Sequence, residues 1–107
     1  MTHLTTHVLD AALGEPASGM EVTLAAVGES IIAQGITDAD GRLHLGPDTL
    51  PARDYTLTFA TGPYFAGRGV ETFYPAVTVT FTVTEGRGHH HVPLLLSPFG
   101  YSTYRGS

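Results

Sequence analysis

The sequence of 107 residues contains no cysteine, and its charged residues make up only 14% of the chain. The absence of cysteine excludes disulfide cross-links, thiol nucleophiles and every cysteine-based zinc site. A typical globular domain carries about a quarter charged residues, so part of this surface is unusually poor in charge. Hydrophobic residues reach 42%. This composition predicts that copies of the chain associate with one another.

Positive charge is also scarce, and long hydrophobic runs are absent. The five lysine and arginine residues leave a net charge of -5, whereas a nucleic-acid partner requires a basic stripe. No stretch approaches the roughly 20 apolar residues of a membrane span, and the first residues lack the pattern of a secretory signal. We therefore expect a cytoplasmic protein with no nucleic-acid and no membrane partner, built as a single domain over residues 1–107.

Short runs of β-branched and aromatic residues alternate with polar residues and end at glycine, proline or aspartate, which is typical of a β-sandwich. The segment 63–69 is too short and too rich in glycine for more than one or two helical turns. The fold class is therefore all-β, with at most one short helix. The expected strands are Leu4–Asp10, Met20–Val27, Ser30–Thr37, Arg42–Leu45, Asp54–Thr61, Ala76–Thr84, His89–Leu96 and Tyr101–Tyr104.

The clearest alternation lies in the segment AVTVTFTVT, residues 76–84. Its valines and phenylalanine share one face, which should enter the core, and its threonines share the other. The threonine face meets either solvent or another subunit.

Histidine is frequent, with six residues, and three of them are consecutive at positions 89–91. On a strand, His89 and His91 would point to one face and His90 to the other. Such a pair could bind a metal ion or hold a proton-transfer base, and it could equally form a plain polar face. His7 would share a strand face with Thr5, where a lone histidine is most often structural.

Motifs for an activated serine, a phosphate-binding loop or an HExxH zinc site are absent. The remaining chemistry is that of histidine and arginine, which suits proton transfer from water and stabilisation of an oxyanion. By its position alone, Arg42 after the turn pair Asp40-Gly41 would be a solvated charge, and Arg105 next to the C-terminus would receive no role.

The C-terminal segment HHHVPLLLSPFGYSTYRGS resembles the closing segment of the 5-hydroxyisourate hydrolases, the enzyme branch of the transthyretin-like family. The segments LTTHVLDAALGEPASGMEVTL, TDADGR and YFAGRGVETFYPAVTVTF resemble other parts of that family, so the similarity covers nearly the whole chain. The final YRGS separates the enzyme branch from the hormone-carrying branch. His90 stands where the family would place an aromatic residue, and the loop around residues 28–30 is shorter than expected.

The resemblance implies a prealbumin-like sandwich of two four-stranded sheets. Strands would pair edge to edge into dimers, and two dimers would form a homotetramer with the active sites in the groove between them. The implied reaction is hydrolysis of the small-molecule substrate 5-hydroxyisourate to 2-oxo-4-hydroxy-4-carboxy-5-ureidoimidazoline in urate degradation, with no cofactor and no metal.

The family's functional residues can be transferred position by position. The resemblance assigns catalysis to His7, Arg42 and His91. It assigns substrate binding to His89, Tyr104, Arg105, Gly106 and Ser107. Either His91 or His7 would take the proton from water, and the sequence does not decide between them. Arg42 would hold the carbonyl oxygens and the charge that develops on them.

Two other functions compete with this hypothesis. A zinc-dependent hydrolase could use His7, His89 and His91 as three imidazole ligands. A transthyretin-like carrier would bind a small molecule without turnover. The tail itself is expected to continue from an edge strand, Tyr101–Tyr104, into the pocket wall, so that additional residues after Ser107 would block the site.

Overall fold

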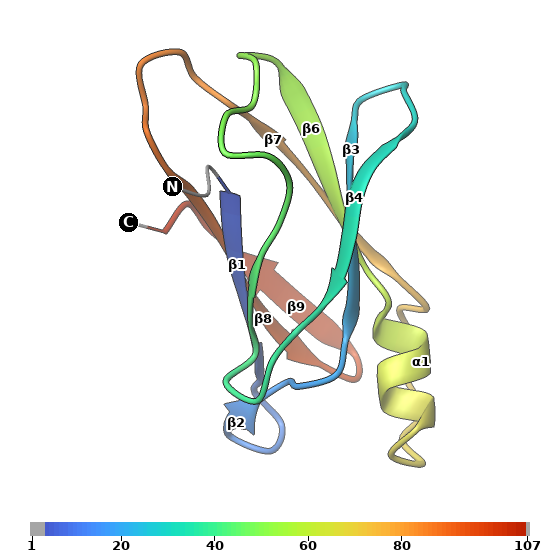
Figure 1. Cartoon of the computed structure of the whole chain (residues 1–107). Coiled ribbons are helices and arrows are strands. Elements are labelled where there is room, and N and C mark those ends of the chain that lie inside the picture. Colours follow the sequence, from blue (N-terminus) through green and yellow to red (C-terminus); the bar gives the residue numbers. More distant parts are fainter. Residues whose placement is uncertain (1–3, 107) are drawn as a thin grey trace.

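A computed structural model describes residues 4–106, which form two β-sheets and one short helix (Figure 1). The first sheet contains β1 (Leu4–Asp10), β2 (Glu15–Pro16), β5 (Arg42–His44), β8 (His90–Ser97) and β9 (Gly100–Thr103). The second sheet contains β3 (Glu21–Ala26), β4 (Ile31–Ile36), β6 (Asp54–Phe59) and β7 (Val77–Thr82). The helix α1 spans Thr61–Ala66 and follows β6. The predicted all-β sandwich with one short helix is confirmed.

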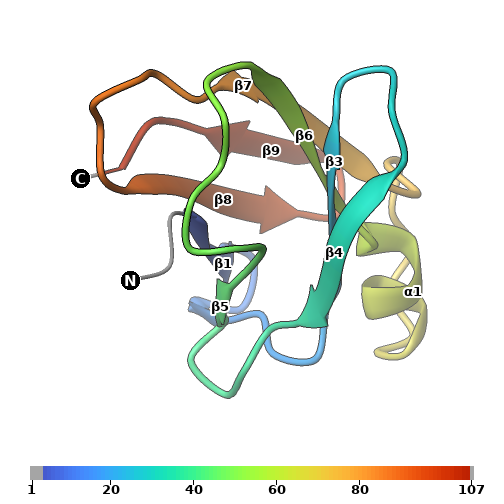
Figure 2. The ribbon, with the colours of Figure 1, turned by 45° about the horizontal axis from the view of Figure 1, so that its top comes forward.

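Strand β1 lies in the middle of the first sheet. On one side it pairs in parallel with β8, and β8 forms an antiparallel pair with β9 (Figure 2). The other side of β1 is shared, because β5 pairs with residues 5–7 and β2 pairs with residues 9 and 10. The first sheet therefore has five strands, although β2 and β5 occupy the same side of β1. Four strands were predicted for this sheet, and the additional strand is the two-residue β2. The second sheet has the predicted four strands, in the order β4-β3-β6-β7.

The core lies between the sheets and is built by strict alternation of side chains. In β1, Leu4, Thr6, Val8 and Asp10 are buried, while the residues between them are half-buried on the outer face. Burying one Leu, Val or Phe side chain contributes about 1.5–3 kcal/mol, so a core of this size is the main stabilising term. The largest fully buried side chains are Tyr55, Phe59, Phe65, Leu4, Met20, Leu24, Leu57, Leu94, Leu96, Val8, Val22 and Val77.

The alternation predicted for residues 76–84 is confirmed. Val77 and Val83 are buried, Val79 and Phe81 are half-buried against the core, and the threonines between them are exposed. His90 also points inward, as the predicted alternation of residues 89–91 requires. It is buried, and the backbone N–H of Thr84 donates to its Nε2 atom over 3.3 Å.

A buried carboxylate joins β1 to α1. Asp10 is 1% exposed, and its Oδ1 atom accepts the backbone N–H groups of Ala12 and Leu13. Its Oδ2 atom accepts the hydroxyl of Tyr64 on α1 over 2.9 Å. Burial, followed by this bond to Asp10, raises the pKa of Tyr64 to about 12. The phenol thus stays protonated and remains a donor to Asp10.

No helix within residues 4–106 is long and apolar enough to cross a membrane.

Candidate active site

The outer face of the first sheet gathers most of the predicted site residues. Thr5 on β1 pairs with His44 of β5 on one side and with His91 of β8 on the other. Two residues further along β1, His7 pairs with Arg42 and with Pro93. Residues that pair across neighbouring strands point to the same face of a sheet. The register of β5, β1 and β8 therefore places Arg42, His7 and His91 together.

The ring of His7 is held in one orientation by the loop before β5. Its Nε2 atom lies 2.9 Å from the backbone carbonyl oxygen of Asp40. A carbonyl oxygen only accepts hydrogen bonds, so Nε2 must carry the hydrogen. Neutral His7 then has its lone pair on Nδ1, and only that nitrogen could accept a proton from water.

The same loop fixes the backbone at Arg42. Oδ1 of Asp38 accepts the backbone N–H groups of Asp40 and Arg42, each over 2.9 Å. The bond from Arg42 is the main reason that the pKa of Asp38 is lowered. Gly41 closes the turn with a φ of +75°, and its carbonyl accepts the N–H of Val8 over 2.7 Å. Arg42 is consequently the first residue of β5 and follows a turn that is hydrogen-bonded directly to β1.

Thr5 links the two outer histidines of the run. Its Oγ1 atom lies 2.8 Å from Nε2 of His89 and 2.8 Å from Nδ1 of His91. The two imidazoles are stacked, with ring centroids 6.2 Å apart and an angle of 27° between their planes. The predicted pairing of His89 with His91 on one face is confirmed. We did not predict a role for Thr5 from the sequence, although alternation placed it on the same strand face as His7.

The environment of His91 favours the neutral imidazole. Partial burial is the largest cause that lowers the pKa of His91, followed by the charges of His89, His7 and Arg42. A group that stays neutral near neutral pH can accept a proton, which is what a general base must do.

The chain beyond β9 returns to His91. The backbone N–H of Gly106 donates to the carbonyl oxygen of His91 over 2.9 Å, and the two residues form an isolated antiparallel bridge. Gly106 does not have a positive φ. The glycine is required instead by close contact with the imidazole, because a Cβ atom there would meet the ring.

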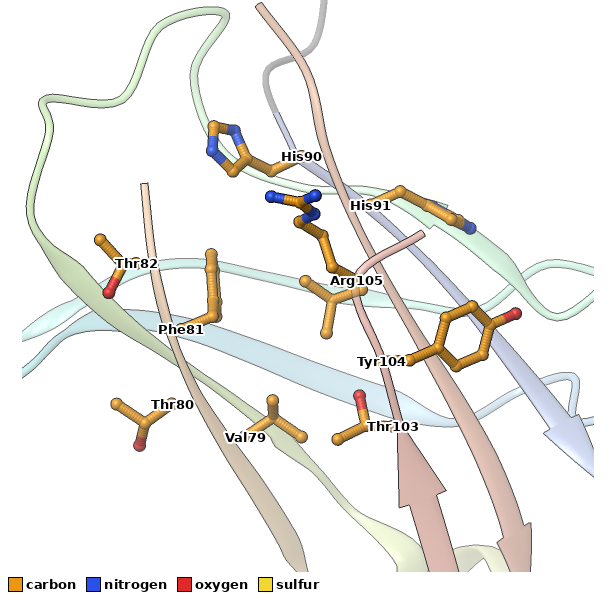
Figure 3. A pocket seen from close by; sticks show the side chains of 10 residues that line it. Val79, Thr80, Phe81, Thr82, His90, His91, Thr103, Tyr104 and Arg105 are labelled. Carbon is orange, nitrogen blue, oxygen red and sulfur yellow. The ribbon is translucent and has the colours of Figure 1, made fainter. Parts of the chain in front are cut away.

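The tail residues divide between the two sides of β8, as Figure 3 shows. Tyr104 points to the side of His91, whereas Arg105 points toward His90. Arg105 lines a pocket of about 300 Å³ between β7, β8 and β9, together with Phe81 of β7. His91 and Tyr104 line this pocket as well, so Arg105 borders a cavity that reaches His91. Ser107, also predicted to bind substrate, lies outside the described residues.

The three histidines that could have formed a zinc site do not converge. Within residues 4–106, no three side chains of His, Cys, Asp or Glu are grouped so that they could hold a metal ion. Nε2 of His89 and Nδ1 of His91 both lie within hydrogen-bonding distance of Oγ1 of Thr5.

Comparison with known proteins gives consistent matches over nearly the whole chain. A family model described as the HIUase/Transthyretin family matches residues 4–106. The 5-hydroxyisourate hydrolase of Salmonella dublin is 45% identical over 109 residues, covering 97% of this chain and 80% of that protein.

Solved structures show the same relationship. The 5-hydroxyisourate hydrolase of Klebsiella pneumoniae superposes with a TM-score of 0.90 at 41% identity, covering 100% of this chain and 94% of that chain. The transthyretin of Sparus aurata superposes with a TM-score of 0.88 at 34% identity, covering 99% and 97%. A 5-hydroxyisourate hydrolase and a transthyretin thus share this fold.

Proposed function

The chain belongs to the HIUase/transthyretin family, and from this premise we propose that it hydrolyses 5-hydroxyisourate in urate degradation. The product is 2-oxo-4-hydroxy-4-carboxy-5-ureidoimidazoline, and the reaction opens a cyclic amide with water. The observation that carries the proposal is the joint presence of Arg42, His7 and His91 on one sheet face. A base and a fixed cation are the two groups that this hydrolysis needs.

The proposed mechanism begins with a water molecule beside His91. The imidazole removes a proton while the water oxygen attacks a ring carbonyl carbon of the substrate. Arg42 stabilises the oxyanion through its planar guanidinium, which can donate two parallel hydrogen bonds. The ring C–N bond then breaks, and the proton held by histidine passes to the departing nitrogen. His7 and Tyr104 border the same face and would orient the substrate.

His91 is the better candidate for the base. Its lowered pKa keeps it neutral, and its Nε2 atom is the ring nitrogen that Thr5 does not occupy. His7 uses its Nε2–H to reach Asp40, which makes it suitable as an oriented substrate ligand.

The carrier function is the second candidate, since a transthyretin superposes on the whole chain. The two functions differ in turnover. A hydrolase accelerates the decay of 5-hydroxyisourate absorbance at substoichiometric concentration, whereas a carrier slows the decay by sequestering one ligand per site. The zinc-dependent alternative predicts that a chelator abolishes the activity and that zinc restores it; our proposal predicts full activity after exhaustive chelation.

We further propose that the active protein is a homotetramer, a dimer of dimers. Strands β7 and β9 are the outermost strands of their sheets and line one common pocket, so both edges face the same side of the sandwich. Unpaired edges of this kind associate readily. Near them, Phe73 is 72% exposed and Phe99 is 65% exposed, which a second copy would cover. Native mass spectrometry tests this assembly, and a monomer with full activity would contradict it.

The single-domain organisation over residues 1–107 and the cytoplasmic location remain predictions from the sequence. One cooperative unfolding transition of the tetramer and fractionation of the source cells would test them.

A further inference from the structure

One hydroxyl group stands between two imidazoles on the active face. Oγ1 of Thr5 lies 2.8 Å from Nε2 of His89 and 2.8 Å from Nδ1 of His91. The two histidines differ in their access to solvent, because His89 is exposed and His91 is half-buried. Thr5 therefore connects a shielded ring with one that water reaches freely.

The single hydrogen of the hydroxyl restricts how these bonds can be arranged. Thr5 can donate to only one of the two nitrogens, so with neutral rings the other imidazole must donate its N–H to the oxygen. In one arrangement Nδ1 of His91 is protonated and the lone pair of His91 is on Nε2. In the other arrangement Nε2 of His89 is protonated, and His91 carries its hydrogen on Nε2.

We propose that His89, Thr5 and His91 form a proton relay, in which His89 is the terminal acceptor that exchanges the catalytic proton with solvent. This inference rests on the proposed function for its role in turnover, but the hydrogen-bonded chain itself does not depend on it. Of the three, His91 is the base that removes the proton from the attacking water.

Each step of the relay conserves protons. The attacking water gives a proton to Nε2 of His91. The hydrogen on Nδ1 of His91 moves to Oγ1 of Thr5, and the original hydroxyl hydrogen moves to Nε2 of His89. The result is a neutral His91, a neutral Thr5 and a positively charged His89 in contact with solvent. The reverse sequence returns a proton to the departing nitrogen of the substrate.

The surroundings favour moving the positive charge outward. The charged groups that act on His91 are His89 before β8, His7 on β1 and Arg42 on β5. His44 of β5 shares the sheet face on the far side of Thr5, and Arg105 lines a pocket with His91. Tyr104 lies on the same side as His91 in Figure 3. A proton kept on His91 would remain close to Arg42 in a partly dehydrated site. On the exposed His89 it is hydrated.

The chain of bonds makes a prediction that needs no substrate. The lowered pKa of His91 favours the neutral form of that ring. Once His89 is charged, its Nε2–H must donate to Thr5, and the hydroxyl must then donate to Nδ1 of His91. Protonation of His89 should therefore convert His91 to the tautomer with hydrogen on Nε2.

The experiment is a pH titration of the ¹⁵N-labelled imidazoles by NMR, in the parent and in Thr5→Val, which keeps the shape of the side chain and removes the hydroxyl. We expect the tautomer of His91 to follow the charge of His89 in the parent and not in Thr5→Val. Thr5→Ser should restore the coupling. The matched control is Thr78→Val, whose hydroxyl bonds Thr58 over 3.2 Å in the other sheet. A His91 tautomer that ignores the charge of His89 in the parent overturns the relay.

Kinetics with 5-hydroxyisourate test whether the chain works during turnover. Thr5→Val and His89→Gln should lower kcat by at least about 10-fold, because each variant loses part of the acid–base assistance to the reaction. In mixtures of H₂O and D₂O, the parent rate should depend on deuterium content with the curvature expected for the three protons that move in the relay. Both variants should give the straight line of one proton.

A purely orienting role for Thr5 would lower kcat without changing that curvature, and this result would also overturn the relay. If the parent does not hydrolyse 5-hydroxyisourate at all, the proposed function fails, while the NMR titration still decides whether the hydrogen-bonded chain exists.

Discussion

A Cβ atom placed on Gly106 would lie 2.4 Å from Cδ2 of His91, well inside van der Waals contact. The ring of His91 therefore packs directly against the backbone of Gly106. Replacing Gly106 with alanine should push the imidazole away from Thr5 and lower kcat by at least about 10-fold, since small displacements of a catalytic group are costly. Steady-state kinetics with 5-hydroxyisourate would measure the loss.

Gly100→Ala is the matched control, because a Cβ at that position meets Oγ of Ser97 at an ordinary 3.7 Å. It should keep nearly the parent rate. If Gly106→Ala is as active as Gly100→Ala, the contact between Gly106 and His91 has no bearing on catalysis.

Asp38 should be required for the position of Arg42, although its carboxylate is not expected to touch substrate. Asp38→Ala removes the acceptor for the backbone N–H groups of Asp40 and Arg42. The backbone of Arg42 and the carbonyl of Asp40 that bonds His7 then lose the hydrogen bonds that hold them in place. We expect about 10-fold lower kcat/KM, with Asp38→Asn restoring part of the activity through its amide oxygen.

Asp40→Ala provides the control within the same loop, since it removes a carboxylate and retains the backbone carbonyl that His7 contacts. A loss in Asp40→Ala equal to that in Asp38→Ala would show that loop charge matters rather than these backbone bonds.

The pH dependence of kcat/KM follows from the state of His91. A general base works only when it is neutral, and the pKa of His91 is lowered by burial and by the neighbouring His89, His7 and Arg42. The rate should thus be constant through neutral pH and fall only on acidification below the ordinary histidine value of about 6.5. A rate that increases as the solution is acidified would exclude His91 as the base.

The tail should be sensitive to extension. Gly106 is bonded to His91, so residues appended after Ser107 must pass close to the active face. A C-terminal tag should lower kcat sharply, whereas the same tag before Met1 should not. Equal activity of the two tagged proteins, at the same oligomeric state, would contradict this prediction.

The sequence predicted strands well where side-chain alternation is the determining signal. Leu4–Asp10 begins and ends as predicted, and the inward position of His90 and the outward positions of His89 and His91 follow from the same period of two. The two-residue β2 is too short to produce any such pattern, which is why it was missed.

Alternation assigns a residue to a face but cannot identify its neighbours. Thr5 and His91 are 86 positions apart, and only the parallel register of β1 with β8 brings them into contact. That register depends on the packing of the whole sandwich. The role of Thr5 was therefore not predictable from local sequence. Arg105 points to the side opposite Tyr104, and its predicted contact with substrate stays a prediction.

The central claim is that Arg42, His7 and His91 together hydrolyse 5-hydroxyisourate. The most direct measurement generates this unstable compound with urate oxidase and follows its absorbance decay with catalytic amounts of the parent protein and of Arg42→Ala, His7→Asn and His91→Asn. We predict that the parent accelerates the decay and that each variant loses at least about 10²-fold in kcat/KM while keeping the parent's circular dichroism spectrum. A parent protein that leaves the decay unchanged, or three folded variants with the parent's activity, would contradict the account.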